Sequence, residues 1–570
     1  MSTKISERVI SPDRAVGALW GAAIGDALGW PIERLDRRLD QGARKAIQPQ
    51  ISFQHWKRRS GSRFHAYEEV IRPGEYSDDT QLLIATARSL LRGSRWSVYL
   101  AGQELPIWLL YERGAGTSIK RAARSWQHNK SPWNNSPKVA KSYFATGANG
   151  AAMRVLPHAL VPHLSITEMH TQVMLNSALT HGHPRALLGA MLYTQAARFM
   201  VDKSDTLAFG ELVEYLLETP QEWSQMRPWA HGYKNWLDAA QKNYAGEYEK
   251  LWQKTVEELI LGLQLCHSAV QEGVLSESMD FLRKIGGLDK RTNGAGTVSA
   301  LAAIYFSSLY AAAPVTGLLE AAFAIGADTD TIASMVGGLL GALLGTEWIA
   351  PEWREVQDKE YLSGLAHQLI KADVYNNRER NENGFMRWQA KDSEELLNQL
   401  MGISKNQRVN LGPLGQAEAV KKSRYRPIVH RWQHLGWELK SIDGQTIYIT
   451  KTMQASEKNK PTFEEPPQVA ARTQVMAIAT FLRDISDVIP SSIAPEAALQ
   501  MAADTVLFLE NDRQQMGEEK FFTGLSTEHY IDQVAQKIQK KHNLVTQQAQ
   551  KEIICKFAKN MSHTDRKSVV

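Results

Sequence analysis

The feature that most constrains the fold of this 570-residue chain is a helical spacing of apolar residues that continues from about residue 11 to residue 369. Runs of Ala, Leu, Gly and Ile recur with the period of a helix, and short Gly, Pro and Asn breaks separate them. Convincing strand alternation is absent from this part of the sequence. The pattern predicts a nearly all-α first domain, with helices over 80–91, 186–200, 298–312 and 331–344.

The length of the chain and its later composition predict further modules. A single hydrophobic core seldom organises 570 residues, so we expect one large domain and at least one additional region. After a polar run at 374–384, residues 437–450 are typical of two short strands around the hairpin-forming dipeptide Asp443-Gly444. The sequence therefore predicts a first domain, a linker or irregular segment and an accessory α+β region, over 11–375, 376–420 and 421–570.

Cysteine content and charge exclude several classes of protein. Cys266 and Cys555 are too few for a disulfide framework or a cysteine-rich zinc site, and the first residues do not resemble a signal peptide, so we expect a cytoplasmic protein. The most apolar stretch, 317–345, contains one Glu and two Asp, which are costly in lipid, and is interpreted as buried helices around a site. The net charge of +5 does not by itself indicate a nucleic-acid partner.

Two short acidic motifs are the most informative chemical feature. Ser-Asp-Asp-Thr at 77–80 and Asp-Thr-Asp-Thr at 328–331 each immediately precede an apolar helix. Such residues can be simple helix caps, but capping needs only one of the two adjacent charges Asp78 and Asp79. Hard divalent cations such as Mg²⁺ prefer oxygen ligands on rigid supports. The repeated surplus of carboxylates therefore favours metal binding, provided that the two helix starts meet in space.

Three glycine-containing loops are candidates for the lining of a binding cleft. Gly-Ala-Asn-Gly at 147–150 can bring backbone N–H groups against a pyrophosphate, with an ordinary turn as the alternative. His-Gly-His-Pro at 181–184 is compatible with a metal site, although a turn with one satisfied histidine is more common. For Asn-Gly-Ala-Gly at 293–296 a turn before a helix is favoured over a position in the cleft.

A basic segment lies between the first helix and the first acidic motif. Residues 34–65 contain nine Lys or Arg against two Asp, interleaved with Phe53, Trp56 and Phe64. Basic side chains with aromatic platforms suit a polyanionic, base-bearing partner such as nucleic acid. The alternative is that the arginines bind the pyrophosphate of a substrate or form salt bridges with acidic helices.

Four sequence motifs together resemble the ADP-ribosylglycohydrolase family. They are Gly-Asp-Ala-Leu-Gly at 25–29, Ser-Asp-Asp-Thr at 77–80, an Asn-Gly loop within 147–154 and Gly-Ala-Asp-Thr-Asp-Thr at 326–331. The motifs occur in the order of the family and span about 15–345. Ala148 and Ala327 stand where many relatives have glycine. The resemblance implies an all-α, compact multi-helix fold, with 11–375 as the catalytic domain.

The resemblance also implies a site. It predicts two Mg²⁺ ions, with Mn²⁺ as an alternative, at the base of an ADP-ribose cleft, held by Ser77, Asp78, Asp79, Asp328, Asp330 and Thr331. Glu33 matches a family acid that lies over the site, with a surface salt bridge as the alternative, and either Glu33 or Asp79 is expected to assist proton transfer. The residues implied to bind the substrate are Gly147, Asn149, Gly150 and His181.

The expected function is metal-dependent hydrolysis at the anomeric carbon of ribose, which removes ADP-ribose from an ADP-ribosylated protein, at arginine or serine as the default. The basic segment keeps an alternative open, namely removal of ADP-ribose from nucleic acid. A second alternative is a non-enzymatic ADP-ribose-binding or structural descendant of the family, against which the intact acidic motifs weigh. No membrane partner is expected.

Overall fold

The computed structural model describes residues 8–36, 48–62, 64–273, 277–372, 385–429 and 431–454, with residues 532, 533, 535, 536 and 551. The chain divides into two compact units, Met1–Ala455 and Ser456–Val570. Because most of the second unit lies outside the described residues, the fold and the site belong to the first unit.

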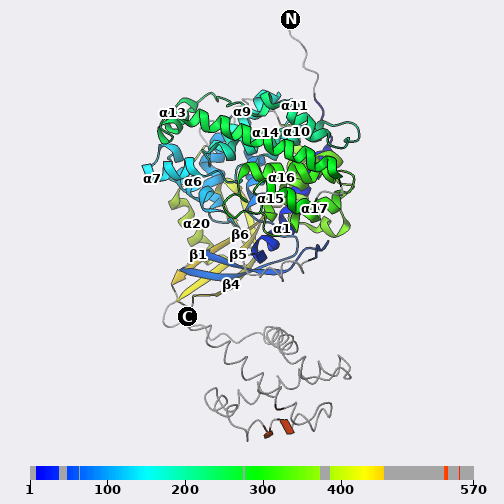
Figure 1. Ribbon diagram of the computed structural model, residues 1–570. Coiled ribbons are helices and arrows are strands. Elements are labelled where there is room, and N and C mark those ends of the chain that lie inside the picture. The colour runs from blue at the N-terminus through cyan, green and yellow to red at the C-terminus, as the bar shows by residue number, and fades with distance from the viewer. Residues whose placement is uncertain are drawn as a thin grey trace. The chain divides into compact units, whose positions relative to one another are not determined.

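Helices form most of the first unit (Figure 1). The α-helices of this unit are α1 (Pro12–Asp36), α3 (Asp78–Leu90), α4 (Trp96–Tyr99), α5 (Leu105–Trp108), α6 (Thr117–Gln127), α7 (Pro137–Ala145), α8 (Leu156–Ala159), α9 (Ile166–Ala178), α10 (Pro184–Asp202), α11 (Glu211–Glu218), α12 (Pro220–Trp223), α13 (Tyr233–Asn243), α14 (Tyr248–Glu272), α15 (Ser278–Lys284), α16 (Gly296–Leu309), α17 (Pro314–Ala322), α18 (Thr329–Leu344), α19 (Lys359–Leu369) and α20 (Ala390–Gly402). The four helices predicted from the sequence are confirmed as α3, α10, α16 and α18.

Helices α1 and α18 lie antiparallel in direct backbone contact along their length. Glycine recurs at every fourth position of α1, and this stripe faces α18. A Cβ atom on Gly21 would lie 2.1 Å from the carbonyl oxygen of Gly337, a distance that no side chain tolerates. The hydroxyl of Thr329 donates to the carbonyl of Gly29 at 2.9 Å. This close contact brings the C-terminal end of α1 to the acidic start of α18.

A six-stranded sheet combines strands from distant parts of the sequence. Its order is β1-β2-β4-β5-β6, with β3 paired to β4, and all the pairs are antiparallel. In Figure 1 the blue strands near the N-terminus lie beside the yellow strands from beyond residue 400. The strands are β1 (Trp56–Ser62), β2 (His65–Ile71), β3 (Arg408–Asn410), β4 (Gln416–Pro427), β5 (Trp432–Ser441) and β6 (Thr446–Gln454).

The sheet confirms one prediction from the sequence and corrects another. The hairpin predicted at 437–450 is confirmed by β5 and β6, whose turn contains Gly444 at φ 102°. The prediction that strands are absent before residue 369 was wrong, because β1 lies inside the basic segment and β2 begins at its last residue. The sequence WKRRSGS of β1 has no alternation of apolar and polar residues, since the strand is held by pairing with β2 rather than by an apolar face of its own.

The compact unit extends past residue 375, where the first domain is predicted to end. Strands β4 to β6 pair with β2, and α20 contacts them through a hydrogen bond from Lys451 to Asn398. The predicted domain boundaries stay a prediction. The apolar stretch 317–345 forms α17 and α18 inside the helical core, and among the described residues no helix is long and apolar enough to cross a membrane.

Candidate active site

The start of α3 carries the first acidic motif. Ser77 is the N-cap residue, and its Oγ accepts a hydrogen bond from the backbone N–H of Asp79 at 3.3 Å. Asp78 and Asp79 occupy the first turn and are almost fully buried. The backbone N–H of Asp78 donates to the carbonyl of Arg113 at 2.9 Å, which ties the helix start to the segment between α5 and α6. Since Ser77 performs the capping, neither carboxylate is needed as a cap.

Asp26 of α1 orients this helix start from within the core. Its fully buried carboxylate accepts hydrogen bonds from the backbone N–H groups of Ser77 and Thr80 at 3.0 Å and from the Thr80 hydroxyl at 2.7 Å. Burial raises the pKa of Asp26, whereas these hydrogen bonds act to lower it. No role was predicted from the sequence for Asp26 within the motif at 25–29. Its position as a charged residue in an otherwise apolar stretch already indicated that it has a buried partner.

The start of α18 carries the second acidic motif. Asp328 is the N-cap residue, Asp330 lies in the first turn, and Thr331 follows with its backbone N–H donated to Asp330 Oδ1 at 2.9 Å. Asn149 donates from Nδ2 to Asp328 Oδ2 at 3.0 Å and to the Ser299 hydroxyl at 2.9 Å. The predicted substrate residue Asn149 therefore lies directly against a predicted metal ligand.

One turn of α1 contacts both acidic helix starts, since Asp26 accepts hydrogen bonds from Ser77 and Thr80 and a Cβ atom on Gly29 would lie 2.7 Å from the backbone nitrogen of Asp330. Burial raises the pKa of both Asp78 and Asp79 well above the usual range, and the charge of Asp330, at the start of the other helix, raises it further. Asp79 Oδ1 is buried and accepts no hydrogen bond from the described residues. A cluster of carboxylates without a cation among them stabilises a bound positive charge.

The donor chemistry of the cluster fits a hard divalent cation, because the candidate ligands are carboxylates and hydroxyls only. Within the ranges that the structure describes, no three His, Cys, Asp or Glu side chains already converge as a group that could hold a metal ion. The hydroxyl-bearing residues Ser77 and Thr331, which are also candidate ligands, are both buried.

Glu33, near the C-terminal end of α1, lies close to the second helix start. Removal of water around Asp328 raises the pKa of this carboxyl group, and the nearby charge of Glu33 raises it further. Hydrogen bonding with Asp330 and the hydrogen bond donated by Asn149 act in the opposite direction. Contact between α1 and α18 thus brings Glu33 near Asp328, and its role at the site stays a prediction.

The predicted phosphate loop and the loop at 293–296 pair with each other. The N–H of Asn149 donates to the carbonyl of Gly294, and the N–H of Gly296 donates to the carbonyl of Gly147, both at 2.9 Å. A Cβ atom on Gly294 would lie 3.0 Å from Asp328 Oδ2. The loop at 293–296 precedes α16, as predicted, and it also lines the acidic site.

His181 lies next to this loop. It is fully buried, and a Cβ atom on Gly150 would lie 3.2 Å from its ring. Burial, followed by the charge of Arg154, lowers the pKa of His181 to about 3, so the ring is neutral at physiological pH. Nδ1 interacts with the Thr180 hydroxyl at 2.8 Å, whereas Nε2 has no hydrogen-bond partner among the described residues. His183 instead accepts from the N–H of Arg185 and caps α10, which agrees with the turn interpretation.

Comparison with known proteins assigns the family. The sequence model described as ADP-ribosylglycohydrolase matches residues 7–379, which include every predicted site residue. The chain belongs to the ADP-ribosylglycohydrolase family.

Several members of the family resemble the chain at low identity. The ADP-ribosyl-[dinitrogen reductase] glycohydrolase of Rhodospirillum rubrum is 28% identical over 30% of this chain, which covers 52% of that relative. ADP-ribosylarginine hydrolase Tri1 of Pseudomonas putida is 24% identical, with 63% of this chain and 78% of the relative covered. ADP-ribosylhydrolase ARH3 of Danio rerio is 25% identical, with coverages of 66% and 95%. A solved structure titled ADP-ribosylglycohydrolase-related protein complex aligns at 20% identity and a TM-score of 0.39, with 64% of this chain and 98% of that chain covered.

Arg154 joins the loop at 147–150 to the end of α9, and the sequence predicted no role for it. The buried guanidinium donates to the carbonyl of Gly150 at 2.6 Å, to Asn176 Oδ1 at 2.9 Å and to the Thr180 hydroxyl at 2.8 Å. Burial lowers the pKa of Arg154 to about 9. Arg154 thereby links the loop at 147–150 to His181. The one signal in the sequence was a single charge within the apolar run 151–156.

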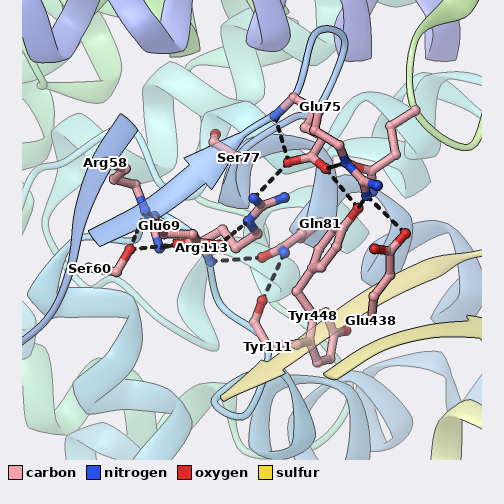
Figure 2. Close-up of polar contacts among 12 residues, drawn as sticks. Arg58, Ser60, Glu69, Glu75, Ser77, Gln81, Tyr111, Arg113, Glu438 and Tyr448 are labelled. Carbon is pink, nitrogen blue, oxygen red and sulfur yellow. Dashed lines mark hydrogen bonds and ion pairs between the residues drawn. The ribbon is translucent and has the colours of Figure 1, made fainter. Parts of the chain in front are cut away.

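A second buried polar cluster joins the helices of the family domain to the sheet (Figure 2). Arg113 donates to Glu69 of β2 at 3.0 Å and to Glu75 at 2.8 Å, and Arg58 of β1 also pairs with Glu69, at 2.8 Å. Tyr448 of β6 donates its hydroxyl to Glu75 at 2.8 Å. These salt bridges support the structural interpretation of the basic segment for Arg58, while residues 37–47 and 63 of that segment lie outside the described residues.

Proposed function

We propose that the chain is a metal-dependent ADP-ribosylglycohydrolase that hydrolyses the bond between the anomeric carbon of ribose and an acceptor atom of an ADP-ribosylated protein. The packing of both acidic helix starts against one turn of α1 is the observation that carries this proposal: Asp26 accepts hydrogen bonds from the start of α3, and a Cβ atom on Gly29 would lie 2.7 Å from the backbone nitrogen of Asp330. The names of the relatives support the reaction, and the name of Tri1 makes arginine the first acceptor to test. Serine is the other acceptor that we propose to test.

Two divalent cations, Mg²⁺ or Mn²⁺, are proposed as cofactors. The residues proposed to hold them are Ser77, Asp78, Asp79, Asp328, Asp330 and Thr331. When bound, the cations supply Lewis-acid chemistry and neutralise the repulsion among the carboxylates. Both helix starts are well suited to hold charged ligands, because the helix N-termini stabilise ionised carboxylates.

The substrate is proposed to be oriented by the paired loops and His181. Gly147 and Gly150 allow a pyrophosphate to approach the backbone closely, and Asn149 fixes the loop to the acidic cluster through Asp328. The neutral His181 has a vacant Nε2 that can accept a hydrogen bond from a hydroxyl or donate one to an oxygen, according to its tautomer. These contacts would hold the ribose with its anomeric carbon towards the carboxylates.

Cleavage then requires a proton to leave the attacking water and a proton to reach the departing acceptor atom. The transition state resembles an oxocarbenium ion, which nearby carboxylates stabilise. Glu33 and Asp79 are the two candidates for the proton transfer. Asp79 is the more deeply buried of the two, whereas Glu33 is partly exposed near the end of α1.

The test is release of ADP-ribose from arginine-linked, serine-linked and nucleic-acid-linked substrates, with and without Mg²⁺ or Mn²⁺. We expect release from a protein-linked substrate that depends on the cation and is lost in Asp79→Asn and Asp330→Asn. Release that is unchanged by a chelator, or near-normal activity in both variants, would contradict the proposal. Binding of ADP-ribose without release from any substrate would indicate a non-enzymatic descendant.

Nucleic acid is the second candidate for the acceptor, and one surface feature favours it. Arg59 of β1 and Arg426 of β4 flank Glu68 of β2 in one cross-strand row, and both arginines are exposed. Arg424 is exposed two residues further along β4. Such a row suits a phosphate backbone. A clear preference for a protein-linked over a nucleic-acid-linked substrate would remove this candidate.

A further inference from the structure

A pocket of about 370 Å³ opens beside the acidic site, between the hairpin of β1 and β2, strand β6 and the residues around α5 and α6. None of the six proposed metal ligands lines it. The lining residues used below are Arg58, His65, Glu69, Glu112, Arg113, Lys120, Arg124, Tyr448, Thr450 and Thr452.

The pocket is positively charged. Four Arg or Lys side chains line it against two carboxylates, those of Glu69 and Glu112. Glu69 is already engaged by Arg58, Ser60 and Arg113, and Glu112 pairs with Lys120 at 3.0 Å. The excess of cations therefore favours an anion in the pocket.

Two buried nitrogen atoms at this pocket have no hydrogen-bond partner in the described part of the chain. One is Nη1 of Arg113, whose side chain is only 3% exposed, and the other is Nδ1 of His65. Figure 2 shows Arg113 held between Glu69 and Glu75 through its other nitrogen atoms. A buried guanidinium N–H without an acceptor is costly, and an oxyanion in the pocket would satisfy it.

The pocket adjoins the acidic site through shared residues. The carbonyl of Arg113 accepts the hydrogen bond from the N–H of Asp78, and a Cβ atom on Gly114 would lie 3.0 Å from Asp78 Oδ1. Trp30 of α1 lies against the guanidinium groups of both Arg58 and Arg113, at 5.2 and 5.6 Å. An anion in the pocket is therefore a near neighbour of the site where the bond would be cleaved.

One wall of the pocket lies outside the family match. Tyr448, Thr450 and Thr452 all belong to β6, whereas the match to the family ends at residue 379. The sheet thus adds to the family domain a binding surface that the shared motifs do not predict.

We propose that this pocket binds a phosphate-sized oxyanion of the acceptor, close to the ADP-ribosylated residue of a protein. The assignment of the anion to the acceptor rests on the proposed function, whereas binding of the anion does not. Arg113, just before α6, and Arg124, within α6, would supply charge and hydrogen bonds to the anion. Thr450 and Thr452 of β6 line the same pocket.

The first experiment is calorimetric titration of inorganic phosphate into the full chain in the presence of saturating ADP-ribose, which blocks the cleft. We expect saturable binding that weakens about tenfold in Arg113→Lys and several-fold in Arg124→Gln. The control is Arg121→Gln, an exposed arginine of the same helix that does not line the pocket. Absence of saturable binding, or equal binding in Arg124→Gln, overturns the proposal even if Arg113→Lys fails to fold.

The second experiment identifies the source of the anion. Two ADP-ribosylated peptides that differ only in a phosphoserine beside the modified residue are compared by KM. We expect a lower KM for the phosphorylated peptide, and we expect Arg124→Gln to remove the difference. Equal KM values in wild type overturn the assignment to the acceptor and indicate free phosphate. If Arg124→Gln changes the KM of an ADP-ribosylated oligonucleotide but of neither peptide, the assignment to a protein acceptor is overturned in favour of nucleic acid. If neither peptide is cleaved while phosphate still binds, the proposed function fails and the anion site stands.

Discussion

The protein contains two neighbouring buried clusters of charged residues. The acidic starts of α3 and α18 form one from carboxylates, and in the other, at the sheet, arginines pair with a carboxylate. At the acidic site, burial raises the pKa values of Asp78 and Asp79, and the charge of Asp330 raises them further. At the sheet, Glu69 is equally buried, but Arg58 and Arg113 pair with it. Burial acts to raise the pKa of Glu69, and the two arginines overcome it and lower the pKa to about 2.

Whether a buried carboxylate is paired with an arginine distinguishes a candidate ligand site from a cluster that only stabilises the fold. A carboxylate whose charge is matched within the protein stabilises the fold and needs no ligand. Carboxylates that repel each other in the interior destabilise the empty protein, and they are retained where a bound cation supplies the missing charge. The pocket beside Arg113 has the opposite imbalance, an excess of positive charge, because more Arg and Lys side chains than carboxylates line it.

The strongest way to break this comparison is to remove a carboxylate from the acidic site. Asp79→Asn should reduce the release of ADP-ribose by at least about three orders of magnitude, or about 4 kcal/mol of transition-state stabilisation. Stability without metal should not fall, because the substitution removes repulsion. Activity and chemical denaturation of the same samples check both parts. Glu320→Gln, at an exposed carboxylate of α17, should change neither.

The matching substitution at the sheet should have the opposite pattern. Glu69→Ala leaves Arg58 and Arg113 buried with a partner missing and should lower the free energy of unfolding by about 3–5 kcal/mol. All 16 tryptophans precede residue 455, so tryptophan fluorescence during denaturation reports on the first unit alone. Glu68→Ala is the control, because its exposed pair with Lys57 should contribute about 0–1 kcal/mol. Similar losses in both variants would refute the distinction.

The pH dependence of stability gives a second test of the role of Glu69. Because folding lowers the pKa of Glu69 to about 2, its ionised form contributes about 3 kcal/mol of stability above the pKa of the unfolded chain. That contribution should be lost as the pH falls from about 5 towards 2. Denaturation over this range should therefore show wild type losing more stability than Glu69→Ala. Parallel curves for the two proteins would show that Glu69 is not the group responsible.

The smallest effect concerns the proposed cofactor. A cation that binds the folded state alone should stabilise it by about 2.7 kcal/mol when its concentration is one hundred times Kd. We expect Mg²⁺ or Mn²⁺ to raise the stability of the first unit, EDTA to reverse the effect, and Asp330→Asn to abolish it. Equal stabilisation of wild type and Asp330→Asn would place the cation elsewhere.

Much of the helical domain and of the site could be predicted from local pattern. The helices α3, α10, α16 and α18 follow from apolar periodicity, and the acidic starts of α3 and α18 from the excess of carboxylates over what capping requires. The roles of Asp26 and Arg154 could not be predicted, because each depends on partners remote in sequence. Asp26 accepts from the backbone at the start of α3. Arg154 donates to Asn176 and Thr180.

The sequence by itself determined which segments become helices and which oxygen-rich side chains gather at their starts, because periodicity and capping act over a few residues. The tertiary structure alone decided which buried charges find a partner. Glu69 is preceded by the same basic segment that had suggested nucleic acid, yet Arg58 neutralises it across a hairpin that has no pattern of its own. The pocket beside Arg113 arises because β6, far along the chain, completes its wall. The pairing of β2 with β4, and of Arg113 with Glu69 and Glu75, joins residues far apart in the sequence, and no local pattern encodes it.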